Sequence, residues 1–138
     1  MANTIRDLMT SNPTTIEPDK TVVDAAKLMR DEDAGLIPVV EGQKLIATIT
    51  DRDITLRVVA EGKDASSTNV RDVASTRLVT VDPDQDLDEA LRLMAKNQVR
   101  RLPVVEEDGK LVGIVAQADV ARHTTDEKTG EVVEQISK

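Results

Sequence analysis

The segments Pro38-Val-Val40 and Thr50-Asp-Arg-Asp53 recur along the chain as Pro103-Val-Val105 and Ala116-Gln-Ala-Asp119. The two copies are offset by 65 positions at the Pro-Val-Val segment and by 66 at the later one, because the second copy carries one extra residue between them. A repeat that occurs twice predicts two similar units packed face to face, since a solenoid needs three or more stacked units. We therefore expect the functional residues at the seam between the copies.

Each copy predicts the same order of elements, which is strand, helix, strand, strand, helix. Helix starts are indicated by capping-box pairs, Thr21 with Asp24 and Asp86 with Glu89. Apolar residues at helical spacing, including Met29 and Met94, predict one buried face per helix. The expected strands are 14–16, 36–40 and 45–49 in the first copy and 78–81, 102–105 and 111–115 in the second, and the last helices run from Thr50 to Gly62 and onward from Gln117.

The repeat predicts an α/β fold of the α+β type built from two similar units. We expect the first unit at residues 1–62, a polar linker at 63–69, the second unit at 70–123 and a tail at 124–138. A short amphipathic helix is predicted at 131–136. Because each unit has a small sheet and the tail carries apolar residues, we also expect a homodimer.

Composition narrows the classes of partner. The net charge of −8 lacks the basic excess that phosphate backbones attract, and the absence of Phe, Trp and Tyr removes the usual platform for stacking single-stranded bases. Nucleic acid is therefore not an expected partner. The chain contains no cysteine and begins without an apolar stretch resembling a signal peptide or membrane span, which favours a cytoplasmic protein without membrane contact.

The sequence contains no motif that is typical of a catalytic site. His123 is the one histidine, so no histidine pair can share a metal, and no metal site is expected. The six glycines are scattered and form no phosphate-binding loop of the Walker or dinucleotide type. Close acidic pairs such as Asp51 and Asp53 occur readily by chance among 26 carboxylates. We therefore expect a protein without enzymatic activity or a catalytic cofactor, and an enzyme is the least favoured hypothesis.

One segment does indicate a binding site. In Ala47-Thr-Ile-Thr50-Asp-Arg-Asp53 an apolar strand runs directly into a helix. The unpaired amides of a helix start attract anions, and a carboxylate beside them could accept both hydroxyls of a ribose. The alternative is an ordinary capping box between Thr50 and Asp53. Asp119 recurs at the matched position although Ala116 replaces the hydroxyl, which favours a functional carboxylate.

Two copies that carry a Pro-Val-Val strand and end in a Thr-x-x-Asp-like segment resemble the CBS domain pair, or Bateman module. The resemblance covers about residues 4–122, and segments such as Val99-Arg-Arg-Leu-Pro103 are similar to the stand-alone, stress-linked CBS-pair proteins of actinobacteria. It implies a tandem pair of half-domains related by a pseudo-two-fold axis and commonly dimerising into a flat disc. The pair is expected to be a regulatory or sensor module that binds an adenine nucleotide or related adenosyl compound in two clefts between the copies. The alternative is a protein-interaction module whose clefts stay empty.

The resemblance also implies the site residues. Asp53 and Asp119 match ribose-binding aspartates, Thr50 matches a phosphate-side hydroxyl, and Arg100 and Arg101 match phosphate contacts. The full set of implied nucleotide-binding residues is Thr14, Ala34, Gly35, Leu36, Thr50, Asp53, Val79, Val99, Arg100, Arg101 and Asp119. The copies differ, and we expect Thr50 to serve the Asp53 cleft and the two arginines to serve the Asp119 cleft. Because an arginine contact outweighs a neutral hydroxyl bond, the arginines are expected to dominate phosphate binding.

Overall fold

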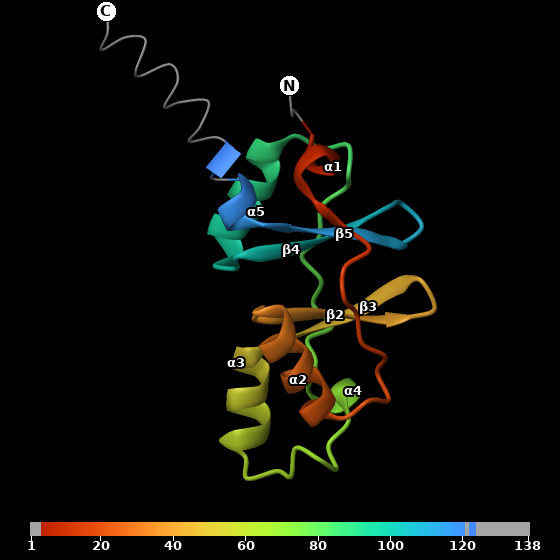
Figure 1. Cartoon of the computed structure of the whole chain (residues 1–138), viewed down its shortest axis with the longest axis vertical. Coiled ribbons are helices and arrows are strands. Elements are labelled where there is room, and N and C mark those ends of the chain that lie inside the picture. Colours follow the sequence, from red (N-terminus) through yellow and green to blue (C-terminus); the bar gives the residue numbers. More distant parts are fainter. Residues whose placement is uncertain (1–3, 121, 124–138) are drawn as a thin grey trace, which may run out of the picture.

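The structure, a computed structural model, describes residues 4–120, 122 and 123. It has two halves, each with a β-hairpin near the middle of the molecule and helices toward an outer end (Figure 1). One half contains α2 (Val22–Glu32), β2 (Leu36–Glu41), β3 (Lys44–Thr50), α3 (Asp51–Ile54) and the π-helix η1 (Thr55–Val59), and the other contains α5 (Leu87–Asn97), β4 (Arg101–Val105) and β5 (Leu111–Ala116). The α+β class and the tandem arrangement are confirmed.

The first strand predicted in each copy is wrong. Ile16 and Val81 each form a single parallel bridge, to Val39 and Val104, and no longer ladder develops around them. Proline explains the first interruption, because Pro13 and Pro18 flank the segment and neither can donate a ladder hydrogen bond. The hairpins are present as predicted, with β2 paired to β3 and β4 paired to β5, both antiparallel.

Short segments at the start of each copy cross to the opposite half. They are α1 (Ile5–Leu8), the two-residue strand β1 (Thr10–Ser11), which pairs with β5, and α4 (Val70–Val73). Ile5 has no exposed surface and lies in the core of the second half, whereas Val70 and Val73 lie in the core of the first. The two halves are therefore tied together by an exchange of their leading helices.

Polar contacts repeat this exchange. The backbone amides of Ile5 and Arg6 donate to Gln85 and Pro83, and those of Val70 and Arg71 donate to Lys20 and Pro18. Two exposed ion pairs also correspond between the halves: Arg6 lies 3.3 Å from Asp84, and Arg71 lies 3.1 Å from Asp19. Exposed pairs of this kind contribute little to stability, so the buried apolar contacts dominate the exchange.

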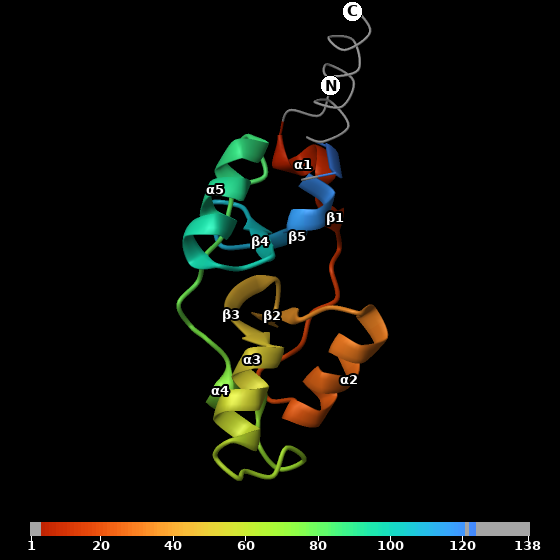
Figure 2. The same ribbon diagram turned by 90° about the vertical axis from the view of Figure 1, so that its left-hand side faces the viewer.

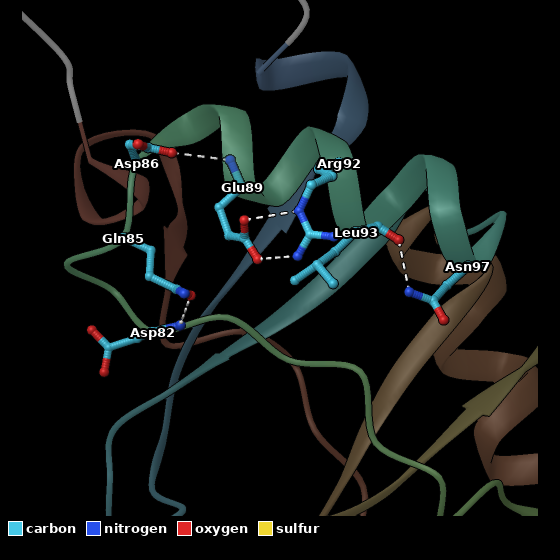
Figure 3. A network of polar contacts seen from close by, with 7 residues as sticks. All are labelled: Asp82, Gln85, Asp86, Glu89, Arg92, Leu93 and Asn97. Atoms are coloured by element: carbon cyan, nitrogen blue, oxygen red, sulfur yellow. Dashed lines mark hydrogen bonds and ion pairs between the residues drawn. The ribbon is translucent and has the colours of Figure 1, made fainter.

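The two long helices begin in related but different ways. Thr21 and Asp24 form the reciprocal capping box that the sequence predicts for α2. At α5 the Asp86 carboxylate accepts from the Glu89 amide, but the Glu89 side chain turns to Arg92, 2.6 Å away, instead of returning to the cap (Figure 3). Hydrogen bonding to the Arg92 guanidinium lowers the pKa of Glu89. The predicted box at Asp86 is therefore half formed.

The hairpins meet at the centre of the molecule. Figure 2 shows the two hairpins facing one another across the seam. Leu45 donates a backbone hydrogen bond to Gly109, and Leu111 donates one to Gln43, so the two hairpin turns are joined. The segment that leads into the second copy also joins the seam, because Thr48 and Ser75 exchange backbone hydrogen bonds of 3.0 and 2.8 Å. Met29 and Met94 lie in the two separate cores, as predicted from helical spacing.

The end of the first copy follows the sequence prediction closely. A helical run covers α3 and η1, and Gly62, with a φ of +67°, stands just after it in the left-handed region that favours glycine. Residues 117–120 are helical, as expected from Gln117 onward. The predicted helix at 131–136 lies outside the described residues. Among the described residues no helix has the length and apolar character needed to cross a membrane.

Candidate functional site

Two adjoining hollows lie at the seam between the halves. The first, called the inner cavity, has a volume of about 150 Å³ and is lined by Leu36, Thr48, Thr50, Asp53, Ser75, Arg77, Val79, Val99, Arg101, Leu102 and Pro103. The second, called the groove, has a volume of about 1260 Å³ and is lined by Asp33, Gly35, Leu36, Thr50, Asp51, Arg52, Asn97, Gln98, Val99, Arg100, Arg101, Ala116, Gln117 and Ala118. The two hollows adjoin one another, and they share the lining residues Leu36, Thr50, Val99 and Arg101.

Thr50 and Asp53 occupy the wall of the inner cavity where β3 passes into α3. The Asp53 Oδ2 accepts a 2.9 Å hydrogen bond from the Thr50 amide, and the Thr50 Oγ1 accepts a 3.0 Å bond from the Asp53 amide. The second oxygen of Asp53, Oδ1, has the Arg57 Nε at 3.9 Å, and its side chain is 12% exposed. The pair is thus a capping box that leaves one carboxylate oxygen and the Thr50 hydroxyl proton available to a ligand.

The predicted anion site at the helix start is wrong. The Asp51 amide donates to the Gly35 carbonyl at 3.0 Å, and the Arg52 amide donates to the Asp51 carboxylate at 2.8 Å. The Asp53 amide is taken by Thr50. The Gly35 carbonyl and the side chains of Asp51 and Thr50 therefore satisfy the backbone donors of this turn, and positive charge at the site must come from side chains.

Arginine side chains supply that charge. Six arginines lie within 4.0 Å of a carboxylate: Arg6, Arg30, Arg57, Arg71, Arg92 and Arg122. The other four, Arg52, Arg77, Arg100 and Arg101, line the inner cavity or the groove, and their side chains have no hydrogen bond or ion pair within residues 4–120, 122 and 123. In a chain of net charge −8, unpaired arginines gathered at one seam indicate a site for an anion.

The two hollows group these residues differently from the expected division between two clefts. Arg101 lines both hollows, the inner cavity together with Thr50 and Asp53 and the groove together with residues 116–118. The reason is that the hairpins face one another, so the start of β4 reaches across the seam toward the end of β3. Asp119 lines neither hollow, and its Oδ1 lies 3.3 Å from the Arg122 guanidinium. One of the two matched aspartates therefore stands at the candidate site.

The remaining predicted site residues line the inner cavity, the groove or neither of them. Val79, Val99 and Leu36 line the inner cavity, and Gly35 and Arg100 line the groove. Two predicted residues line neither hollow. The Thr14 hydroxyl donates to the Glu32 carboxylate at 2.7 Å, and the Ala34 amide donates to the Met29 carbonyl at the end of α2.

Sequence reasoning missed Ser75 and Arg77, which enter the inner cavity from the segment between α4 and Val79. A difference between the two copies could have indicated Arg77. The position that corresponds to Arg77 in the first copy is Asn12, so an arginine appears in one copy where the other has a neutral residue. Arg52 was likewise passed over, although it belongs to the repeated Thr-Asp-Arg-Asp segment.

Comparison with known proteins agrees with this architecture. The family model described as "CBS domain" matches residues 5–60 and again residues 70–126. The chain belongs to the CBS domain family. Its two matched units make it a CBS pair, and the fold predicted from the repeat is that of the family.

Relatives of similar length support this assignment. The CBS domain-containing protein YhcV of Bacillus subtilis is 43% identical over 136 residues, covering 98% of this chain and 96% of its own. Hypoxic response protein 1 of Mycobacterium tuberculosis is 37% identical, covering 87% of this chain and 84% of its own. The predicted resemblance to stand-alone CBS-pair proteins is confirmed.

Two solved structures show the same fold. A structure of Hypoxic Response Protein I with two coordinated zinc ions matches with a TM-score of 0.79 and 37% identity, over 87% of this chain and 98% of that one. A structure of CBSX2 in complex with AMP matches with a TM-score of 0.77 and 27% identity, over 91% and 98%. In the described part of this CBS pair, no group of three or more His, Cys, Asp or Glu side chains is placed to hold a metal ion.

Proposed function

We propose that this CBS pair is a non-catalytic regulatory module that binds an adenine nucleotide at the seam between its halves. The observation that carries the proposal is the placement of the four unpaired arginines around Asp53 and Thr50. Phosphate oxygens and a guanidinium form charge-assisted, often bidentate hydrogen bonds. A carboxylate oxygen that faces the same hollow suits the hydroxyls of a ribose.

The two hollows differ in the chemistry that they offer. Apolar side chains, namely Leu36, Val79, Val99, Leu102 and Pro103, form much of the wall of the inner cavity. The groove carries mostly polar and charged side chains. In our proposal the base enters the inner cavity, the ribose meets the Oδ1 of Asp53, and the phosphates extend into the groove toward Arg100 and Arg101. AMP bound to the related CBSX2 supports this class of ligand.

Binding of AMP, ADP, ATP and S-adenosylmethionine tests the proposal by calorimetry. We expect the phosphate-bearing ligands to bind, and we expect their affinity to fall as salt rises because exposed arginines are screened. A triphosphate should lose more affinity with salt than a monophosphate. If none of the four ligands binds or raises the melting temperature at millimolar concentration, the proposed function is wrong and an interaction module becomes the favoured hypothesis.

An exposed apolar surface supports a second proposal, that two copies associate. Leu56 and Val59 lie three positions apart on η1 and are 47% and 69% exposed. Large apolar side chains exposed on one short helix favour burial against a partner surface. The predicted homodimer could use this face whether or not the seam binds a nucleotide.

Light scattering after size exclusion tests the association. We expect a mass about twice the 15.0 kDa of one chain, and we expect the double variant Leu56→Glu, Val59→Glu to elute as a monomer. Leu78→Glu is the matched control, because Leu78 is 39% exposed but lies away from η1. A parent protein that is monomeric at micromolar concentration, or a dimer unaffected by the double variant, would contradict this role for η1.

A further inference from the structure

Arg77 is the one unpaired arginine that faces the inner cavity without also lining the groove. Its side chain is exposed and has neither a hydrogen bond nor an ion pair among the described residues, although the chain carries 26 carboxylates. Arg101 lines both hollows, while Arg52 and Arg100 line the groove alone. The four arginines thus differ in the hollow that they line, and Arg77 is the one that lines the inner cavity alone.

The backbone near Arg77 is held in place. Ser75, two residues earlier, exchanges two backbone hydrogen bonds with Thr48 on the edge of β3, at 2.8 and 3.0 Å. Val79, two residues later, packs against the core of the second half and lines the same cavity. The side chain between these anchors is therefore presented at the cavity from a fixed segment, although it has no partner of its own.

The inner cavity suits a base better than a phosphate group. Five apolar side chains line it, and a mostly apolar wall with a few polar groups is typical of a site for a flat aromatic group. A planar guanidinium at such a site can stack on the face of a nucleotide base, because guanidinium groups form cation–π and stacking contacts with aromatic rings. The chain has no Phe, Trp or Tyr, so no aromatic side chain competes for this role.

We infer that Arg77 stacks its guanidinium on the purine ring of the bound nucleotide and thereby determines specificity for the base. This inference rests on the proposed function and adds to it a base-binding residue in one half only, because the corresponding residue of the first copy is Asn12. A purine presents a larger ring face than a pyrimidine, so the contact favours purine nucleotides. Arg77 then differs in role from Arg100 and Arg101, which face the phosphates.

The test compares ligands that share a base but differ in phosphates. Binding of adenosine, AMP, ATP and cytidine is measured by equilibrium dialysis, with free ligand read by its absorbance, which this aromatic-free chain does not obscure. We expect Arg77→Ala to lower the binding affinities of adenosine, AMP and ATP by a similar factor, about threefold to thirtyfold. Cytidine should lose less, so that discrimination between the two nucleosides shrinks. Arg77→Lys, which keeps the charge but lacks the planar group, should recover only part of the loss.

Lys63→Ala is the matched control, because it removes one exposed positive charge from the loop after η1. It should leave all four affinities unchanged. A loss in Arg77→Ala that grows from adenosine to AMP to ATP would assign Arg77 to the phosphates and overturn the inference. Unchanged affinities in Arg77→Ala would overturn it as well. If the parent binds none of the ligands, the proposed function itself fails, which is a different outcome from either of these.

Discussion

Asp53→Asn is expected to weaken binding of an adenine nucleotide by about tenfold to a hundredfold, because hydrogen bonds to a charged group contribute about 1.5 to 3 kcal/mol. The substitution keeps an oxygen that can accept from the Thr50 amide, so the start of α3 should remain capped. It removes the charge that the ribose hydroxyls would meet at Oδ1. Calorimetry with AMP and with adenosine measures the effect, and both ligands should lose affinity because both contain the ribose.

Asp119→Asn is the matched control for this prediction. Asp119 occupies the corresponding position of the second copy but lines neither the inner cavity nor the groove. Its substitution should change nucleotide affinity less than twofold, and far-UV circular dichroism should show both variants folded. Equal losses in the two variants would contradict the single-site arrangement and would favour a second site at Asp119.

The two aspartates look alike in the sequence, and the difference between them has a local cause. In the first copy the Thr50 hydroxyl accepts from the Asp53 amide, and the reciprocal bond holds the carboxylate at the wall of the cavity. In the second copy Ala116 offers no hydroxyl, and the Asp119 carboxylate pairs with Arg122 instead. The substitution of Ala116 for threonine was visible in the sequence, but its effect on the orientation of Asp119 was not.

Arg101 shows where a repeat pattern stops being informative. The offset of 65 correctly matches it to Leu36, and the structure shows both residues at the edge of their hairpins. The pattern carries no information on which half each side chain faces, because that depends on the packing of one hairpin against the other. Residues within one copy, such as the hairpin strands and Met29, were predictable from local periodicity, whereas the composition of the seam was not.

The repeat pattern also did not predict the exchange of the leading helices α1 and α4 between the halves. The sequence indicates only a short segment before each predicted first strand. Ile5 and Val70 occupy matched positions of the repeat, and each lies fully buried in the half formed mainly by the other copy. The domain limits proposed from the repeat, residues 1–62 and 70–123, therefore differ from the packing of the cores, which reaches across those limits.

Ile5→Ala is expected to lower the free energy of unfolding by about 2 to 5 kcal/mol, the range for truncating a fully buried isoleucine. This is a large share of the stability of an ordinary domain, about 5 to 15 kcal/mol. Urea unfolding followed by far-UV circular dichroism measures the change, since the chain has no aromatic residue to report by fluorescence.

Leu78→Ala provides the control for Ile5→Ala, because Leu78 is 39% exposed and belongs to neither core, so its truncation should lower the free energy of unfolding by less than about 1 kcal/mol. Val70→Ala is the corresponding test in the other half and should destabilise less than Ile5→Ala, since fewer buried carbons are removed. Because α1 and α4 each complete the core of the opposite half, both core variants should shift one cooperative transition rather than split it. If Ile5→Ala unfolds at the same urea concentration as Leu78→Ala, α1 does not contribute to the second core, and the exchange of leading helices is wrong.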